Sequence, residues 1–507
     1  MRAVLQRARA DLVSVRVDLV SARADLVVVL AAAVALAFFM VRERQIAGAA
    51  GFPLDDSWIH LHFARNLAEG AGFAYNPGVP VSGSTAPLWT LLLAAAAAIA
   101  GPTLAMAKAL GVVATLAAGL LTRRAAAAWG ASEPLALGAG AALVASGALT
   151  WGALSGMEVS LAATLVAGAL IAHARDAPLA SVILASLAAL ARPEAILLLP
   201  ALLFARPVSG RRLLIFVVVP ALALAPFIAF CLATVGSPLP ATAAAKVEGG
   251  LVGWLTGVET PARVTFVERP WGFAVEWVCW LATTHWLLPV ALVPALVAVW
   301  WRHGRVLGVP ALTLLLHPLA MALLAPYRGP GFQEGRYSMH LLPLALVVLA
   351  ASVPPFRLRA AGIVAVVYLA LAIPALIPAG TRYGWAVQNI NAMQVDIGRW
   401  IDRELPRAAR IATNDIGAIG YLSRREIIDL MGLVTPAIIP YRRDGDAGVL
   451  RYLLETCPDH VVIFPAWFPA LAARRDLLEP RYRVRLLRNE VAGADEMIVY
   501  RVKQCAV

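Results

Sequence analysis

Two adjacent carboxylates, Asp55 and Asp56, follow the first long hydrophobic segment of the chain. A chain that leaves a bilayer begins its first outer loop at such a point, so we expect both side chains at a membrane surface. A carboxylate there can remove a proton from a substrate as a general base. One of the two could instead cap the helix predicted over residues 58–69, which is a common use of Asp. Because one cap needs one Asp, we favour catalysis for the other.

Three basic residues, Arg192, Lys246 and Arg336, lie far apart in the sequence but are all expected at the outer ends of hydrophobic segments. Each alone could reach towards lipid headgroups. Cations that converge on one cavity suit a phosphate instead, and each charge-assisted contact contributes about 1.5 to 3 kcal/mol. Glu158 either caps the next helix or faces the same cavity, and the sequence leaves both interpretations open.

The sequence offers little for a metal or a nucleotide. His60 and His62 are two residues apart, so on a helix they point in different directions and cannot form a metal-binding pair. Glycine-rich phosphate loops of the Walker or Rossmann type are absent from the sequence. We therefore expect no required cofactor, although Asp55 or Asp56 could still recruit a divalent cation, which needs only carboxylates and water.

The composition of the 507 residues places this chemistry at a membrane. Hydrophobic residues make up 60% of the chain, charged residues only 15%, and the mean hydropathy is +0.75, which leaves too little polar surface to cover a soluble globule. The formal net charge of +12 comes from basic clusters between apolar segments, which favours a role in membrane orientation over nucleic-acid binding.

The apolar runs predict about eleven membrane spans. They are 26–42, 105–122, 134–151, 158–173, 178–190, 194–205, 213–233, 280–301, 306–325, 339–353 and 360–378. The Arg clusters fall in alternate loops, which the positive-inside rule assigns to the cytoplasm together with the N-terminus. The apolar run 87–100 would reverse every later loop if it crossed, so we predict a helix that dips in from the outer face.

The predicted domains are a cytoplasmic N-terminal helix over residues 1–25, a transmembrane module over 26–380 whose first outer loop is 43–104, and an extracytoplasmic domain over 381–507. The last domain is charged throughout and has strand-like runs at 410–413, 461–464 and 497–500, which indicate a small α/β fold. Cys457 and Cys505 lie in it, and their pairing is left open.

The stretch from Asp55 to Gly78 opens with Asp-Asp-Ser-Trp-Ile-His and closes with Tyr-Asn-Pro-Gly. Together with Ser82–Trp89, it resembles the first outer loop of GT-C glycosyltransferases. The nearest likeness is to the group around the mycobacterial terminal β-arabinofuranosyltransferase. Weaker fragments resemble the same group in the same order. They are Ser155–Glu158, Ala191–Glu194, Leu239–Lys246, Gly335–Tyr337, Asn414–Tyr421 and Ile428–Leu433.

This resemblance implies a polytopic α-helical enzyme in the bacterial cytoplasmic membrane that moves a sugar from a polyprenyl-phosphate donor to an extracytoplasmic glycan, lipid or protein. It implies that Asp55 or Asp56 is the base, and that Lys246, Arg336 and Arg192 hold the lipid phosphate. Further substrate-binding positions are expected at Arg65, Tyr75, Asn76, Glu158, Glu194, Glu334, Tyr337 and Asp415. Ser84 and Ala241 depart from the family pattern, which leaves the sugar and the acceptor open.

Two other functions remain to be weighed. A transporter or flippase of lipid-linked sugars would need charged or broken helices near the middle of the membrane and a repeat between halves, and the sequence shows no convincing repeat. A non-catalytic scaffold that binds a glycan would use Asp55 and Asp56 as helix caps. Exchange of each Asp for Asn separates these functions, because a transferase must lose turnover with at least one of them.

Overall fold

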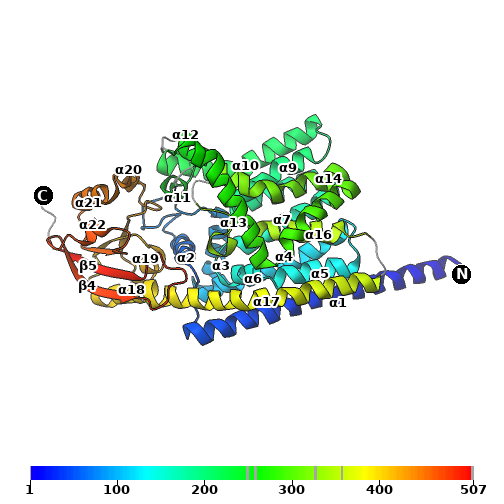
Figure 1. Ribbon diagram of the computed structural model, residues 1–507, viewed down its shortest axis with the longest axis horizontal. Helices are drawn as coiled ribbons and strands as arrows, with labels where there is room; N and C mark the ends of the chain where they lie inside the picture. The colour runs from blue at the N-terminus through cyan, green and yellow to red at the C-terminus, as the bar shows by residue number, and fades with distance from the viewer. Residues whose placement is uncertain (1, 247–249, 256–259, 325–327, 355–357, 504–507) are drawn as a thin grey trace.

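The computed structural model describes residues 2–246, 250–255, 260–324, 328–354 and 358–503, so Cys505 lies outside the described residues. Figure 1 shows a bundle of apolar helices at one end of the long axis and a five-stranded sheet with its helices at the other. The elements that precede the sheet are α1 (Arg2–Ala47), α2 (Asp55–Ala68), α3 (Pro87–Ala100), α4 (Leu104–Ala128), α5 (Glu133–Val144), α6 (Gly147–Leu154), α7 (Val159–Ala174), α8 (Pro178–Ala191), η1 (Pro193–Leu197), α9 (Leu198–Phe204), α10 (Gly210–Val235), α11 (Ala241–Ala245), α12 (Gly250–Leu255), η2 (Val264–Glu268), α13 (Arg269–Thr284), α14 (Leu288–Leu324), α15 (Phe332–Gly335), η3 (Met339–Leu341), α16 (Leu342–Ser352) and α17 (Leu358–Ile390). Those that follow are η4 (Asn391–Val395), α18 (Asp396–Glu404), β1 (Arg410–Thr413), α19 (Gly417–Ser423), β2 (Glu426–Asp429), η5 (Pro436–Ile438), α20 (Ile439–Arg442), α21 (Gly445–Thr456), β3 (His460–Ile463), α22 (Pro469–Ala472), β4 (Leu478–Arg485) and β5 (Glu496–Val502).

The chain is a multi-pass membrane protein. Within the described residues six helices are long and apolar enough to cross a membrane, or seven if the bent pair α5 and α6 forms one span. The six are Ser21–Ala47, Leu104–Ala128, Gly210–Val235, Leu288–Leu324, Phe332–Ser352 and Leu358–Glu404. Shorter apolar helices occupy the predicted spans 158–173, 178–190 and 194–205 and the segment 87–100 predicted to dip in. The full count of eleven spans stays a prediction.

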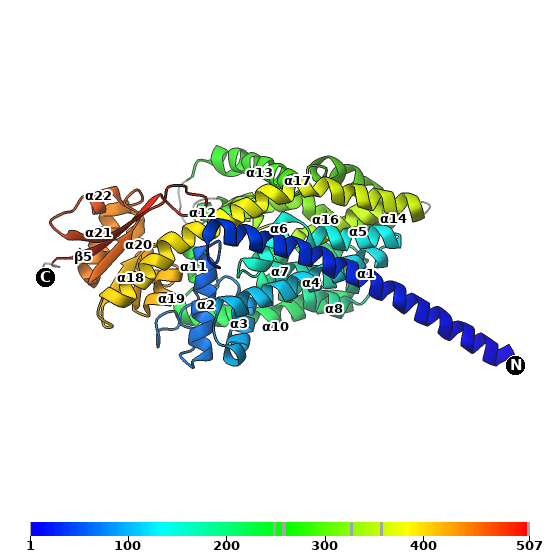
Figure 2. The same cartoon turned by 90° about the horizontal axis from the view of Figure 1, so that it is seen from below.

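Two predicted boundaries fall inside continuous helices. No break separates the predicted N-terminal helix 1–25 from the first span, because both belong to α1, and Figure 2 shows its N-terminal part extending beyond the bundle. Residue 381, where a new domain was expected, lies within α17. This helix runs beside α1 and continues through η4 into α18, so it links the bundle to the sheet. Tyr383 and Val387 of α17 extend the apolar core of the bundle past residue 381, which explains why the helix does not end there.

Residues from the predicted cytoplasmic loops meet at one end of the bundle. Arg123 at the end of α4 binds Asp25 of α1 at 2.9 Å. Trp129, after the same helix, contacts the ring of His173, the last residue of the predicted span 158–173, and the ring of His303 in the predicted loop 302–305. Arg206 donates to the carbonyl of His173 at 2.9 Å, so Arg residues from more than one of these loops lie at the same end of the bundle, and their assignment to the cytoplasm stays a prediction.

The sheet has the order β2-β1-β3-β5-β4, with β1 parallel to β2 and β3 and with β5 antiparallel to its neighbours. The runs 410–413, 461–464 and 497–500 correspond to β1, β3 and β5. The edge strands β2 and β4 were not predicted. In β4 half of the residues are charged and most are only partly buried or exposed, so the strand has no clear apolar pattern. Helix α21 covers one face of the sheet. Helices α18 and α19 cover the other, together with side chains of the first outer loop such as Phe63 and Tyr75, so that loop and sheet share one hydrophobic core.

Candidate active site

Helix α2 begins three residues before the predicted start, so Asp55 and Asp56 form its first turn, where acidic side chains complement the helix dipole. Neither Asp caps the helix, because the N-cap residue is Leu54 and makes no side-chain hydrogen bond. Gly70, just after the C-cap residue Glu69, has a φ of 82°, a backbone conformation that favours Gly at the end of a helix. The two carboxylates then diverge towards different parts of the molecule.

Asp55 is buried and docks against the sheet domain. Its two carboxylate oxygens accept hydrogen bonds from the backbone N–H groups of Gly417 at 2.6 Å and Ala418 at 2.8 Å, at the start of α19. Burial raises the pKa of Asp55 to about 6, although these two hydrogen bonds oppose the shift. The environment of Asp55 is therefore that of a structural link between the first loop and α19.

Asp56 faces the helix bundle instead. Its Oδ2 accepts a hydrogen bond of 2.7 Å from Nη1 of Arg336. The Asp56 side chain is 32% exposed, whereas that of Arg336 is 4% exposed. Burial alone would raise the pKa of Asp56, but the charges of Arg336 and Lys246 outweigh burial and hold this pKa well below its usual range. Asp56 is thus a carboxylate at the edge of the site with its charge fixed by a buried cation.

An unusual backbone segment presents Arg336. Gln333, Glu334 and Gly335 all have positive φ, of 48°, 61° and 78°, a conformation that costs energy for residues other than Gly. The carbonyl of Glu334 accepts a hydrogen bond of 2.8 Å from Nε1 of Trp280. A Cβ on Gly335 would overlap the indole of Trp280, so only Gly fits there. The next residue, Arg336, is thereby directed into the site.

The ring of Tyr337 contacts two guanidinium groups. Cζ of Arg192 is 4.4 Å from the ring centroid and Cζ of Arg336 is 5.0 Å from it, both within cation–π range. Arg192 has an extended backbone between α8 and η1, because Pro193 disfavours a helical conformation in the residue before it. Its side chain is buried and pairs with Glu158 and with Glu194, the latter at 3.0 Å.

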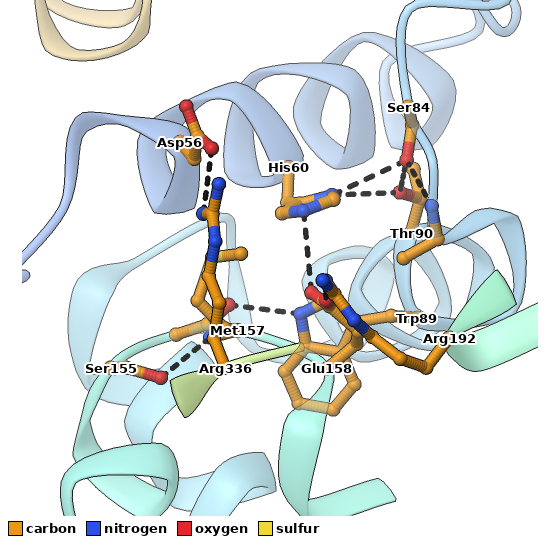
Figure 3. Close-up of polar contacts among 12 residues, drawn as sticks. Asp56, His60, Ser84, Trp89, Thr90, Ser155, Met157, Glu158, Arg192 and Arg336 are labelled. Carbon is orange, nitrogen blue, oxygen red and sulfur yellow. Dashed lines mark hydrogen bonds and ion pairs between the residues drawn. The ribbon is translucent and has the colours of Figure 1, made fainter. Parts of the chain in front are cut away.

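Glu158 precedes α7 and makes no capping hydrogen bond. Figure 3 shows its carboxylate pointing at Arg192 and at His60, whose Nε2 lies 3.5 Å from Oε2 of Glu158. Nδ1 of the same ring lies 3.3 Å from Oγ of Ser84 and 3.4 Å from Oγ1 of Thr90. Burial lowers the pKa of His60, so the ring is neutral at neutral pH. Of the two departures from the family pattern, Ser84 thus lies beside the site.

His60 is a site residue that sequence reasoning missed. The spacing of His60 and His62 argues only against a metal-binding pair, and the ring of His62 stacks on Tyr75. The available signal was the spacing of His60 from Asp56, because residues four apart share one face of a helix. Among the described residues no group of three His, Cys, Asp or Glu side chains could hold a metal ion.

Asp415 reaches the site from the end of β1. Gln394 of η4 donates a hydrogen bond of 2.6 Å to its carboxylate. Burial, followed by the nearby charge of Asp55, raises the pKa of Asp415 well above its usual value.

Lys246 is the residue that follows α11. The first residue of α11, Ala241, donates its N–H to Ser82 at 3.2 Å, so this segment is tied to the first loop.

Four predicted binding residues hold the structure together elsewhere. Asn76 exchanges two hydrogen bonds with the backbone of Ile427, and the hydroxyl of Tyr75 donates to the carbonyl of Ile416. Arg65 donates to the carbonyl of Tyr421 at 2.7 Å, and these four hydrogen bonds attach the first loop to the sheet domain. Glu334 forms a bidentate pair with Arg382 of α17 at 2.7 and 2.8 Å. The site therefore contains Asp56, Arg336, Tyr337, Arg192, Glu158, Glu194, Lys246 and His60, bordered by Asp55 and Asp415.

Comparisons with known proteins concern the fold. The family model described as "Domain of unknown function (DUF8728)" matches residues 386–500. No functionally curated protein sequence matches the chain. The structure of ArnT from Cupriavidus metallidurans bound to undecaprenyl phosphate is 14% identical with a TM-score of 0.59, over 95% of this chain and 99% of that one.

The oligosaccharyltransferase of Archaeoglobus fulgidus in complex with Zn and sulfate is 14% identical with a TM-score of 0.56, over 91% of this chain and 72% of that one. The archaeal oligosaccharyltransferase AglB from the same organism, in complex with an inhibitory peptide and a dolichol-phosphate, gives 12% identity and a TM-score of 0.56, over 95% of this chain and 74% of that one. These likenesses show that the chain has the GT-C membrane fold.

Proposed function

We propose that this protein is a glycosyltransferase that moves a sugar from a polyprenyl-phosphate donor to an acceptor hydroxyl at the outer face of a membrane. The observation that carries the proposal is the meeting of Asp56 with Arg336, Arg192 and Lys246, which come from separate segments of the chain. One acidic group and several cations are what transfer from a sugar phosphate requires. The fold shared with ArnT bound to undecaprenyl phosphate and with AglB bound to a dolichol-phosphate supports a lipid phosphate as the donor's carrier.

Asp56 is the better candidate for the base. A general base must reach a bound hydroxyl within about 3 Å, and Asp56 is partly exposed at the edge of the site. Both oxygens of Asp55 are occupied by backbone N–H groups, so Asp55 has no comparable access to an acceptor. The assignment left open by the sequence is therefore proposed as Asp56 for chemistry and Asp55 for position.

The proposed reaction needs one proton transfer. Asp56 takes the proton of the acceptor hydroxyl while the acceptor oxygen bonds to the anomeric carbon. The bond from that carbon to the phosphate oxygen breaks, and its electron pair stays on the phosphate. A phosphate leaves without being protonated, so no general acid is needed. General-base catalysis of this kind contributes roughly 10²- to 10⁴-fold, and Arg336 and Lys246 would stabilise the charge that develops on the phosphate.

The sheet domain is proposed to hold the acceptor. Asp415 and Asn414 follow β1, and the carboxyl ends of parallel strands are a common place for ligands. Asn414 is 4% exposed, and its Nδ2 is buried without a hydrogen-bond partner. A hydroxyl-rich acceptor could satisfy such a group. The likeness of the first loop to the arabinofuranosyltransferase group supports a pentose or hexose donor, a bacterial cytoplasmic membrane and an extracytoplasmic site.

The test is turnover of defined donors. Purified protein in nanodiscs is incubated with a panel of synthetic polyprenyl-phosphate sugars, with and without a chelator, and released polyprenyl phosphate is measured by mass spectrometry. We expect release from at least one donor and a loss of at least 100-fold with Asp56→Asn. Glu69→Gln is the matched control, because Glu69 ends the same helix segment, is half-exposed and lies 3.8 Å from Arg424, away from the site. Full turnover by folded Asp56→Asn would contradict the role of Asp56.

A further inference from the structure

Arg336, the cation proposed to hold the donor phosphate, is already neutralised. Its Nη1 donates to Asp56 at 2.7 Å and its Nη2 to the hydroxyl of Tyr337 at 3.1 Å. Its Nε is buried and has no hydrogen-bond partner. A guanidinium has five N–H donors and binds phosphate best through two of them. A phosphate that binds Arg336 in this way must compete with Asp56 and can use the unsatisfied Nε–H.

Exposure distinguishes this ion pair from the neighbouring one. Arg192 is held by Glu158, which is fully buried, and by Glu194, which is 16% exposed. The Asp56 side chain is 32% exposed, so it can turn into the aqueous edge of the site. If either glutamate turned away, Arg192 would keep the other one, but the displaced carboxylate would be left without its cation in a largely buried place, which is costly. Of these carboxylates, Asp56 is therefore the easiest to displace.

We propose that the donor phosphate activates the base by displacing Asp56 from Arg336, so that a free carboxylate appears only when the donor is in place. This inference rests on the proposed function. In the resting protein Asp56, the proposed base, and Arg336, which would hold the donor phosphate, are bound to each other. When the phosphate of the donor binds Arg336, the carboxylate of Asp56 is released beside the sugar, where the acceptor hydroxyl arrives.

The charges around Asp56 determine how its pKa changes when the donor binds. Arg336 and Lys246 hold the pKa of Asp56 low in the resting state, and a carboxylate of low pKa is a weak base. After the exchange Arg336 is neutralised by phosphate, and the negative charges of the phosphate and of Asp55 act on Asp56. Lys246 and the neutral ring of His60 remain nearby. The pKa of Asp56 therefore rises on donor binding, and its strength as a base rises with it.

The cycle closes without another reactant. After transfer, the phosphate carries the electron pair of the broken bond and a second negative charge, and Asp56 carries the acceptor's proton. Departure of the polyprenyl phosphate leaves Arg336 without a partner. Asp56 then loses its proton to water and pairs with Arg336 again.

Donor binding by an inactive variant tests the exchange. The probe is a short-chain polyprenyl methyl phosphate, a diester with one negative charge like the donor, and its Kd is measured by calorimetry in nanodiscs. We expect Asp56→Asn to bind the probe about tenfold more tightly than the wild type, equivalent to about 1.4 kcal/mol, because the competing carboxylate is gone. Glu334→Gln is the matched control. It removes the same charge two residues from Arg336, but Glu334 pairs with Arg382, so its Kd should stay within twofold.

Each result has one meaning. Equal or weaker binding by Asp56→Asn overturns the exchange, and so does an equal gain in Glu334→Gln, which would show a general effect of charge. If wild type and variants all fail to bind the probe and no donor of the panel is turned over, the proposed function itself fails. Turnover by wild type together with unchanged binding by Asp56→Asn overturns only the exchange.

A second measurement uses the wild type and does not depend on a variant that folds. Probe binding at pH 5 is repeated in buffers of different ionisation enthalpy, which reports protons taken up. We expect net proton uptake, because the released Asp56 has a higher pKa, whereas the diester does not titrate at this pH. Binding without proton uptake overturns the exchange. Asp56→Asn, where it is stable, should show none.

Discussion

The assignment of Asp55 to a structural role makes the variant Asp55→Asn informative. The carboxylate of Asp55 accepts the N–H groups of Gly417 and Ala418 with one oxygen each, at 2.6 and 2.8 Å. An Asn side chain has one oxygen and one NH₂, so one of the two backbone donors would face another donor. The variant should therefore weaken the attachment of α2 to α19 and leave the proposed base in place.

The size of the effect follows from these contacts. Loss of one charge-assisted hydrogen bond costs about 1.5 to 3 kcal/mol. The same exchange removes a charge that burial disfavours, as the raised pKa of Asp55 indicates, and removes its repulsion with Asp56, which offsets part of this cost. A net cost of about 1 to 2 kcal/mol corresponds to a factor of about 5 to 30 in the local opening equilibrium.

Hydrogen–deuterium exchange is the direct assay. Exchange of the peptide that contains Gly417 and Ala418 should accelerate by that factor in Asp55→Asn, while at least a tenth of wild-type kcat remains. Asp429→Asn is the matched control, because Asp429 also accepts two backbone N–H groups, from Met431 at 2.8 Å and Val434 at 2.9 Å, in the same domain. It should accelerate exchange in its own loop and leave kcat unchanged.

A different outcome would refute this reasoning. If Asp55→Asn reduced kcat by more than 100-fold while exchange at Gly417 and Ala418 stayed at the wild-type rate, Asp55 would act on the substrate rather than on α19. The division of roles between the two aspartates would then be reversed. Loss of both kcat and the native melting temperature would require Asp55→Glu as a second variant, which keeps the charge and should restore folding if the role is structural.

Two further variants test the surroundings of the site. The raised pKa of Asp415 means that its ionised form is disfavoured in the folded state, so wild-type stability is fully present below the unfolded pKa near 4 and is lost as pH rises through the folded value. Asp415→Asn cannot ionise, so its melting temperature should exceed that of the wild type at pH 8 and approach it at pH 5, and equal differences at both values would contradict this. Gly335→Ala should displace Arg336, because the new methyl group overlaps Trp280, and we expect probe Kd to rise at least tenfold. Gly362→Ala, where a Cβ meets no atom within 4 Å, should leave Kd unchanged, and an unchanged Kd in Gly335→Ala would show that this backbone does not direct Arg336.

The sequence predicts the parts of this molecule that depend on local pattern. Apolar runs locate the membrane helices, and the strand-like run at Arg410–Thr413 matches β1 to the residue. The strand β4 is not predicted because Arg481, Arg483 and Arg485 interrupt its apolar pattern. Such charged side chains are tolerated in β4 because it is an edge strand of the sheet. Residue 381, the predicted domain boundary, lies inside α17, because this helix continues in contact with α1 and composition does not reveal that contact.

The site shows the same limit more sharply. Asp55 and Asp56 are adjacent in the sequence, but adjacent residues of a helix point about 100° apart. Only the fold therefore determines which of the two carboxylates pairs with a cation. The partners of Asp55 are more than 360 residues away in the chain. Glu334 and Arg336 are two residues apart and were both expected at the substrate, yet the backbone between them turns one to Arg382 and the other to Asp56. Such pairings depend on dihedral angles that residue types alone do not specify.

The two members of the Asp56–Arg336 ion pair belong to different parts of the molecule. Asp56 is carried by α2, whereas Arg336 is carried by the chain between the bundle helices α14 and α16. Helix α2 is held by apolar contacts on both sides, through Phe63 to the sheet core and through Leu61 to the cluster that contains Trp89. Breaking one ion pair therefore leaves α2 in place. The exchange of Asp56 for a phosphate needs only a change of side-chain rotamer, so hydrogen exchange along α2 should be the same with and without the bound probe.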